Sequence, residues 1–284
     1  MINYYLKIKM RGVASIPPSL IDIQKSKKIL FAIFTRYGDS VIDMVVIKEF
    51  IERYPDKEYL ILCPRQMHPY VVEFLNDIEC VAFNKRNFFE MFKVLRLIVT
   101  RNFDIGFNPW SNGLDSSFFI SFCNKFQFYK DFDKPIIINH YDVVRKYLKL
   151  DEKTWKVNRF KLKSNYNKIL ICPQSTDSNR NLPSNLLDKL ISNFGNKYKD
   201  PEIVIASSNQ NDFRNGCDKF VFKKTKESSE EFIRLMKENS LVVCADSGPL
   251  HIASAMKKDL LVFMRSTDPK IVINSGTFVI IDNV

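Results

Sequence analysis

The chain has 284 residues, 45% hydrophobic and 26% charged, which is ordinary for a soluble globular protein. Its formal net charge of +11 favours an anionic partner: a phosphorylated substrate, a membrane surface or a nucleic acid. No apolar run approaches the roughly 18–20 residues of a membrane span, and the first residues lack the apolar core of a signal peptide.

The lysines and arginines are dispersed along the chain. They form no basic strip interleaved with exposed aromatic residues, and no helix-turn-helix pattern is present, so nucleic acid is the weakest of the three partners. A lysine-rich surface is also compatible with plain solvated faces.

The cysteines are widely spaced, form no CxxC pair and lie mostly in apolar runs. This predicts buried, reduced thiols in a cytosolic protein rather than a disulfide framework or a zinc site. The six are Cys63, Cys80, Cys123, Cys172, Cys217 and Cys244.

Apolar runs alternate with helical periods from residue 27 onward. Residues 27–34 predict a strand, and an apolar stripe from Ile47 to Tyr54 predicts a helix that Pro55 ends. The same patterns predict strands over 59–63, 78–83, 103–108 and, more weakly, 134–139, with helices over 68–75, 88–99 and 115–126.

A polar, basic stretch over 149–167 precedes a second series of the same kind. A helix is expected over 228–239, with Ser228 or Ser229 as its cap. Strands are predicted over 168–172, 202–207, 241–245 and 259–264, and further helices over 183–198 and 249–256.

Short strands separated by helices predict parallel sheets covered on both faces, which is an α/β fold. We expect two Rossmann-like domains, residues 1–155 with an extension over 1–27 and residues 156–284, joined through the stretch 149–167. Such domains would face each other across a cleft at the carboxyl ends of their strands, where ligands of open α/β sheets bind.

The segment ADSGPLH, residues 245–251, places polar residues directly after a predicted strand. Gly248 permits close backbone approach or an unusual φ, and Pro249 suits the first turn of a helix. The N–H groups near Ser247, Gly248 and Leu250 would then form an anion site at a helix N-terminus. An ordinary turn capped by Asp246 or Ser247, with His251 under the helix, fits the spacing equally well.

ADSGPLHIASAM resembles the D-[ST]-G-P-x-H-x-A-x-A segment of the heptosyltransferase family, glycosyltransferase family nine, which moves ADP-activated heptose onto lipopolysaccharide core. ILFAIFTRYGDSVIDM, ILICPQSTDSNRNLP and LLVFMRSTDPK resemble three further segments of that family, so the resemblance covers residues 28–270. It implies the GT-B fold, with the acceptor bound mainly by the first domain and the nucleotide-sugar by the second. The fold commonly works without a metal, so no metal site and no cofactor are expected.

The resemblance implies that Asp39 is a catalytic base, because inverting transfer needs a carboxylate to take the acceptor hydroxyl's proton. The alternative is that Asp39 caps the following helix. Arg180 lies where the family has a cation near the donor phosphates, and a guanidinium can grip two phosphate oxygens. A solvated loop arginine is the alternative there.

Other site residues follow from the same resemblance. Asp246 and His251 are expected to shape the loop or to contact the donor sugar. The predicted donor-phosphate residues are Ser175, Thr176, Ser247, Gly248 and Leu250. The predicted nucleoside-binding residues are Asn209, Gln210, Asp212, Phe222 and Lys223.

The sequence departs from the family at the proline after the GD loop, at the glycine replaced by Met264-Arg265, and at Leu182 in place of tryptophan. We expect an inverting, metal-independent glycosyltransferase that uses a nucleotide-sugar, with ADP-linked sugars favoured. The acceptor would be an anionic or lipid-linked bacterial surface glycan, such as lipopolysaccharide or lipooligosaccharide core or capsule. The expected location is the cytoplasm, with peripheral contact at the cytosolic face of the inner membrane, and no nucleic acid partner.

Two other hypotheses remain open. One is a different transfer reaction on the same fold, with GDP- or UDP-linked sugars or an epimerase-like activity. The other is a non-catalytic relative that binds glycan or scaffolds polysaccharide assembly.

Overall fold

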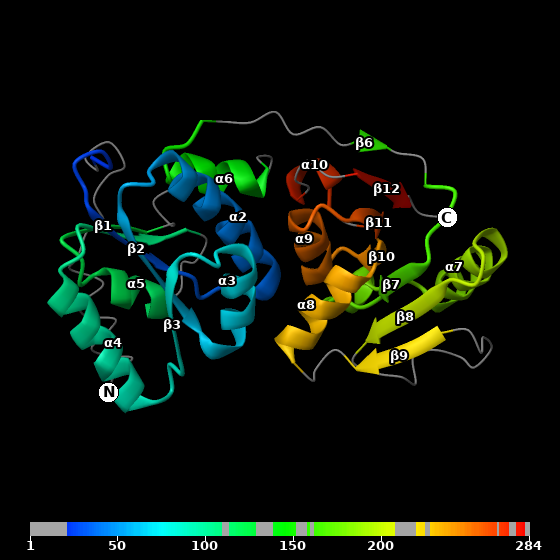
Figure 1. The fold of residues 1–284 in the computed structure, drawn as a ribbon, viewed down its shortest axis with the longest axis horizontal. Coiled ribbons are helices and arrows are strands. Elements are labelled where there is room, and N and C mark those ends of the chain that lie inside the picture. The colour runs from blue at the N-terminus through cyan, green and yellow to red at the C-terminus, as the bar shows by residue number, and fades with distance from the viewer. Residues whose placement is uncertain are drawn as a thin grey trace. The chain divides into compact units, whose positions relative to one another are not determined.

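The protein forms two compact α/β units in a computed structural model, unit 1 over Met1–Lys153 and unit 2 over Thr154–Val284 (Figure 1). Each unit contains one sheet of parallel strands, as the sequence predicts. None of the described helices is long and apolar enough to cross a membrane. The structure describes residues 22–109, 114–128, 139–151, 158–159, 162–207, 220–224, 228–265, 267–272 and 277–281.

Unit 1 has a five-stranded sheet in the order β3-β2-β1-β4-β5. Its strands are β1 (Lys28–Ala32), β2 (Glu58–Pro64), β3 (Glu79–Phe83), β4 (Ile105–Asn108) and β5 (Lys125–Phe128). Its helices are α2 (Tyr37–Arg53), the short 3-10 helix η2 (Arg65–Met67), α3 (His68–Phe74), α4 (Phe88–Arg101), α5 (Leu114–Ile120) and α6 (His140–Tyr147).

The expectation of one helix over 115–126 is wrong in its second half. The helix ends at Ile120, and β5 begins at Lys125, directly after a four-residue turn. Asn124 N–H donates to the Phe103 carbonyl at 2.9 Å and Lys125 N–H to the Asp104 carbonyl at 3.0 Å, so pairing with β4 overrides the local helical period. The sequence patterns also do not indicate α6, which Asn139 caps through a 2.9 Å bond from Tyr141 N–H. Residues 134–138 of the weaker expected strand lie outside the described residues.

Aromatic rings fill much of the core of unit 1. Phe31 on β1 packs against Phe50, Tyr59 and Phe107, with ring centroids 5.5–6.3 Å apart. Strand β1 is therefore the centre of the sheet both in strand order and in side-chain packing.

Unit 2 has a seven-stranded sheet in the order β6-β12-β11-β10-β7-β8-β9. Its strands are β6 (Asn158–Arg159), β7 (Lys168–Cys172), β8 (Glu202–Ser207), β9 (Phe220–Lys224), β10 (Leu241–Ala245), β11 (Asp259–Phe263) and β12 (Thr277–Ile281). Its helices are η4 (Ser178–Arg180), α7 (Ser184–Lys197), α8 (Ser229–Glu238), α9 (Gly248–Ala255) and α10 (Pro269–Val272).

Strands β6, β9 and β12 are not indicated by the sequence patterns. Strand β6 lies inside the stretch 149–167, so part of the expected connection joins the sheet edge by pairing with β12. The cap of α8 is Ser228, one of the two expected, because its hydroxyl accepts a 3.0 Å bond from Glu231 N–H.

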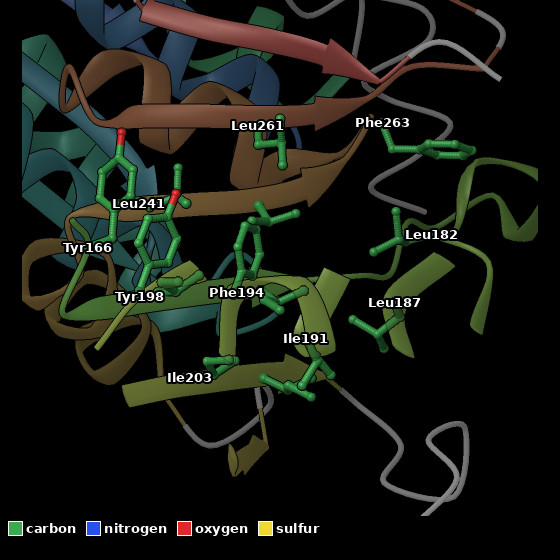
Figure 2. Packing of buried hydrophobic residues seen from close by; sticks show 14 residues of the cluster. Tyr166, Leu182, Leu187, Ile191, Phe194, Tyr198, Ile203, Leu241, Leu261 and Phe263 are labelled. Atoms are coloured by element: carbon green, nitrogen blue, oxygen red, sulfur yellow. The ribbon is translucent and has the colours of Figure 1, made fainter. Parts of the chain in front are cut away.

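Figure 2 shows the core of unit 2 between α7 and the sheet. Leu187, Ile191 and Phe194 form the buried face of α7, at a spacing of three or four residues. They pack against strand residues such as Ile203 and Leu241, so this helix is held to the sheet by one apolar stripe.

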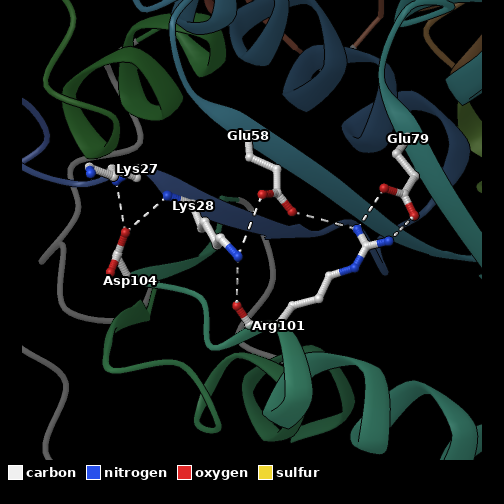
Figure 3. Close-up of polar contacts among 6 residues, drawn as sticks. All are labelled: Lys27, Lys28, Glu58, Glu79, Arg101 and Asp104. Atoms are coloured by element: carbon white, nitrogen blue, oxygen red, sulfur yellow. Dashed lines mark hydrogen bonds and ion pairs between the residues drawn. The ribbon is translucent and has the colours of Figure 1, made fainter.

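A network of polar contacts links residues at the amino ends of the strands in unit 1 (Figure 3). Arg101 makes two hydrogen bonds to Glu79, at 2.6 and 2.8 Å, and this fork raises the pKa of the guanidinium. Asp104 accepts bonds from the backbone N–H groups of Lys27 at 2.7 Å and Lys28 at 2.9 Å. These contacts hold together the sheet edge opposite to the one from which the strand-to-helix loops leave.

The described cysteines are all free thiols. Burial raises the pKa of Cys123 to about 12, so this thiol is protonated at neutral pH. Cys217 lies outside the described residues; the free thiols are Cys63, Cys80, Cys123, Cys172 and Cys244.

Candidate functional site

In both sheets, the direction in which successive strands are added reverses at the first strand. In unit 1 the chain builds β1, β2 and β3 outward and then places β4 on the other side of β1. In unit 2 it builds β7, β8 and β9 and then places β10 on the other side of β7. Ligands of open α/β sheets bind at the carboxyl ends of the strands beside such a reversal, so each unit offers one position for a site.

In unit 2 this position lies between the loops that follow β7 and β10. The two strands pair in parallel, from Ile169 with Leu241 to Cys172 with Cys244. Their loops therefore leave the same edge side by side, although they are about 70 residues apart in sequence.

Asp246 is only 3% exposed, and its carboxylate links its own loop to two others. Its Oδ2 atom accepts a 2.5 Å bond from the Thr267 hydroxyl and lies 3.4 Å from Nη1 of Arg180. These partners follow β11 and β7, so Asp246 fixes the arrangement of the loops after three neighbouring strands. Such contacts are those of a residue that shapes the site.

Arg180 lies between two carboxylates. Besides Asp246, its Nε atom is 3.6 Å from Oδ2 of Asp177, which also caps η4 through a 3.0 Å bond from Asn179 N–H. The Arg180 side chain is still 39% exposed. The two acids therefore orient the guanidinium while part of it stays open to solvent, which is not the state of a freely solvated loop arginine.

Ser175 is held in the same loop by two hydrogen bonds. Its N–H donates to Oδ1 of Asn181 at 2.7 Å, and its hydroxyl donates to the Asp246 carbonyl at 3.2 Å. Thr176 beside it is exposed. Of the two predicted hydroxyl donors, one is thus fixed by the loop and the other faces solvent.

Helix α9 begins at Gly248, two residues after Asp246, with Pro249 in its first turn as predicted. Ser247 occupies the cap position, but its hydroxyl donates to the Ala245 carbonyl at 3.3 Å and does not cap the helix. The structure therefore does not show the simple capping role considered from the sequence. Gly248 has no positive φ, so the unusual φ considered from the sequence is not present.

The remaining residues of this turn are buried. Leu250 is fully buried, and its N–H donates to the Ser247 carbonyl at 3.0 Å, while His251 is 8% exposed within the helix. An anion at this turn would meet the backbone of Ser247 and Gly248 more directly than that of Leu250.

Asp39 is at the corresponding position of unit 1, in the first turn of α2 after β1. The cap of α2 is Arg36, so Asp39 is not the helix cap considered from the sequence. Its carboxylate makes no hydrogen bond or ion pair with any described residue. Burial raises its pKa above the ordinary value, although the charge of Arg36 opposes the shift.

A second carboxyl group, Asp43, lies one turn further along α2 and was missed by the sequence reasoning. It is 1% exposed, and neither carboxyl oxygen has a hydrogen-bond partner among the described residues. Burial raises its pKa well above the ordinary value, and the nearby charge of Asp39 adds to the shift. The i, i+4 spacing in GDSVID was the available signal, because it places both acids on one helical face. Thr267 was likewise visible only as part of the segment RSTDPK.

The predicted nucleoside-binding residues are not placed. Phe222 and Lys223 belong to strand β9, of which only the backbone is described. Asn209, Gln210 and Asp212 lie outside the described residues. Among the residues that are described, no three His, Cys, Asp or Glu side chains gather as a metal site.

Comparison with known proteins shows a similar family over part of the chain. Residues 137–274 match the model of glycosyltransferase family 9 (heptosyltransferase), and this range includes Arg180, Asp246 and Thr267. No curated protein sequence matches significantly.

Several solved structures share the fold. The Escherichia coli heptosyltransferase WaaC with ADP is 10% identical, with 89% of this chain and 93% of that chain covered and a TM-score of 0.67. The E. coli ADP-heptose lipopolysaccharide heptosyltransferase II is 15% identical, with coverage of 90% and 91% and a TM-score of 0.67. A glycosyltransferase of family 9 from Veillonella parvula is 15% identical, with coverage of 90% and 86% and a TM-score of 0.68. Residues 137–274 are therefore similar to the heptosyltransferases of glycosyltransferase family 9, and the chain has the GT-B fold of heptosyltransferases of known structure.

Proposed function

We propose that the chain is an inverting, metal-independent glycosyltransferase. It transfers heptose or a related sugar from a nucleotide-diphosphate sugar, ADP-linked by preference, to a bacterial surface glycan such as lipopolysaccharide or lipooligosaccharide core or capsule. The acceptor is anionic or lipid-linked and is met at the cytosolic face of the inner membrane, and the reaction needs no cofactor.

The observation that carries this proposal is the contact of Arg180 with Asp246 at the strand-order reversal of unit 2. It places an oriented, partly exposed cation beside the backbone turn of Ser247 and Gly248, within the family 9 domain. A cation and a helix N-terminus are the two features that best stabilise a diphosphate. One of the solved structures that share the fold contains ADP.

Unit 2 would act on the leaving group. As the bond between the anomeric carbon and the diphosphate oxygen breaks, the electron pair leaves with the nucleoside diphosphate. Arg180 stabilises that growing negative charge, and the exposed hydroxyl of Thr176 in the same loop would add a hydrogen bond. The Ser175 hydroxyl would add another once it leaves the Asp246 carbonyl. Asp246 holds the guanidinium in place.

Unit 1 would act on the acceptor. Asp39 takes the proton of the acceptor hydroxyl while its oxygen attacks the anomeric carbon from the side opposite the diphosphate. The raised pKa makes the carboxylate a better proton acceptor than an exposed aspartate. The absence of competing hydrogen bonds from the described residues leaves it available for the substrate.

The first test replaces the base. Asp39→Asn should lower kcat by about 100-fold or more, because general bases contribute roughly 10²–10⁴-fold, and should leave ADP binding within a few fold. The measurement is transfer from ADP-heptose to a lipopolysaccharide-core acceptor, with ADP affinity by calorimetry. Glu52→Gln, an exposed acid on the same helix, is the matched control and should keep wild-type kinetics.

Wild-type turnover in Asp39→Asn would refute its role as the base. If the wild-type protein binds ADP but transfers to none of the surface-glycan acceptors, the non-catalytic relative becomes the better description. A preference for GDP- or UDP-linked sugars would instead retain the reaction and change the donor.

A further inference from the structure

Helix α4 of unit 1 exposes an unusual amount of apolar surface. Six large apolar side chains of the described residues are exposed, and four of them are on this helix. Phe88 is 60% exposed, Phe89 78%, Phe92 60% and Val99 58%. Exposed apolar side chains that gather on one element mark an interaction site more often than single ones do. We call these four residues the α4 apolar patch.

The patch is on a helix that is firmly attached to its unit. Val94 and Ile98 on the opposite face are buried in the core, and Asn87 caps the helix by accepting bonds from two backbone N–H groups. Arg101 ties the last turn to Glu79, and Glu90 ties the first turn to Arg65 at 2.7 Å. The exposure of the phenylalanines is therefore a property of the folded helix and not of a frayed end.

The helical geometry places the patch on one side. Phe88, Phe92 and Val99 are separated by four and seven residues, which puts them within about 40° of each other around the helix axis. Phe89 lies beside this line. Figure 1 shows α4 beside β3, the last strand of the sheet on that side of unit 1.

Two cations border the patch. Lys93 and Arg96 are exposed and follow Phe89 by four and seven residues, so they share its side of the helix. Neither makes an ion pair with any described residue. The acid of this helix, Glu90, is turned to the other side and is engaged by Arg65. The surface is thus apolar with two exposed cations at its edge, one of which, Lys93, also interacts electrostatically with Glu90.

We infer that the α4 apolar patch, with Lys93 and Arg96, binds the surface of an anionic lipid bilayer. Phenylalanine rings enter the boundary between headgroups and acyl chains, while neighbouring lysine and arginine side chains reach the lipid phosphates. A stable protein partner would need some 20–30 residues on each side, more than this single helical face supplies. The net charge of +11 favours the same anionic occupant.

Helix α4 lies near the sheet edge of unit 1 that carries Asp39. The helix begins five residues after the end of β3, at the carboxyl edge of the same sheet from which the loop to Asp39 leaves. A lipid-linked acceptor would meet this edge of unit 1 at the bilayer. The inference concerns binding alone and stands whether or not the proposed transfer occurs.

The experiment is flotation of the full-length protein with phosphatidylcholine vesicles that contain 0% or about 30% phosphatidylglycerol, without any sugar donor. We expect binding to the anionic vesicles and little to the neutral ones. Phe88→Ser/Phe89→Ser/Phe92→Ser should lower the partition coefficient at least about 10-fold, since three inserted rings are lost. Lys93→Gln/Arg96→Gln should remove most of the preference for anionic lipid.

Matched controls test whether any exposed residue has the same effect. Val72→Ser removes an apolar side chain that is 50% exposed on α3, and Lys189→Gln/Lys199→Gln removes two exposed cations of unit 2. Both should bind within about twofold of wild type, with unchanged circular dichroism spectra for all variants.

Insertion can be measured directly. In a Phe92→Trp variant, brominated lipids should quench more fluorescence than in the wild type, whereas a Val72→Trp variant should show no added quenching. Equal vesicle binding by the triple serine variant, or no binding by the folded wild type, would overturn the inference. So would a concentration-dependent dimer that the serine variant loses, because the occupant would then be a second copy.

Discussion

At the residue scale, the Asp43 side chain is buried in unit 1 without a hydrogen-bond partner among the described residues. A carboxylate without hydrogen bonds in a buried position is costly, so the group stays protonated at a pH where an exposed aspartate is ionised. Its neighbour Asp39 is one helical turn away, and keeping Asp43 neutral avoids two adjacent negative charges. A neutral Asp43 therefore adds no negative charge beside Asp39 on this face of α2.

This environment predicts a pH-dependent stability. The folded-state pKa of Asp43 is above its unfolded value of 3.8, so the native state binds more protons between the two values and stability falls as pH rises through this window. Asp43→Asn cannot ionise. Relative to wild type, its free energy of unfolding should rise by about 1 kcal/mol for each pH unit within the window.

Urea unfolding of both proteins at pH 4, 5, 6, 7 and 8 measures this difference. Glu52→Gln, which removes an exposed acid from the same helix, should show an almost constant difference from wild type. A constant difference for Asp43→Asn as well would mean that Asp43 is ionised in the folded protein.

At the scale of elements, Gly106 sets how closely α5 and the turn after it approach strand β4. A Cβ atom at this position would lie 2.7 Å from Cβ of Ile120 and 2.8 Å from Sγ of Cys123. Real Cβ atoms do not come that close, so the helix or the strand would have to move. The short strand β4 is thus packed against α5 because this residue has no side chain.

Two glycine variants test this packing, and we expect them to change the free energy of unfolding in opposite directions. Gly106→Ala should destabilise the protein by about 1–3 kcal/mol through overpacking. Gly195→Ala, in helix α7 with no atom within 4 Å of the added Cβ, should stabilise it by about 0.5–1 kcal/mol. Thermal unfolding of both variants in one buffer is the measurement. Equal effects of the two changes would show that the approach of α5 does not depend on Gly106.

At the scale of the whole molecule, the proposed function predicts that a nucleotide binds to unit 2, most of which matches the family 9 model. ADP at about 100 times its Kd should stabilise the native state by about 2.7 kcal/mol, with or without Mg²⁺. A thermal-shift screen of ADP, GDP, UDP and CMP at equal concentration measures the preference. No shift with any nucleotide would contradict the proposed donor site.

Two arginine variants test whether the nucleotide binds beside Arg180. Arg180→Ala should reduce the shift caused by ADP, because it removes the cation beside Asp246. Arg234→Ala removes an arginine that pairs with Glu231 and Glu238 on the surface of α8, and it should leave the ADP shift unchanged.

The sequence by itself determined the fold class and most of the central strands and helices. Apolar runs of four to six residues and helical stripes such as Leu187, Ile191 and Phe194 depend on local spacing, so they predicted the parallel α/β fold. Local spacing also placed Pro249 in the first turn of α9 and Asp39 just after the first strand. The resemblance over 28–270 depended on the same short segments.

Only the tertiary structure decided which loops meet. The contacts among Arg180, Asp246 and Thr267 depend on the order of β7, β10 and β11 in the sheet, and strand order depends on pairings between distant segments that leave no local pattern. Pairing with β4 likewise turned Lys125–Phe128 into a strand against its helical period. Burial is also a tertiary property: it left Asp43 without a partner and left Phe89 exposed, and neither residue type indicates that outcome, because both depend on what the rest of the unit packs against them.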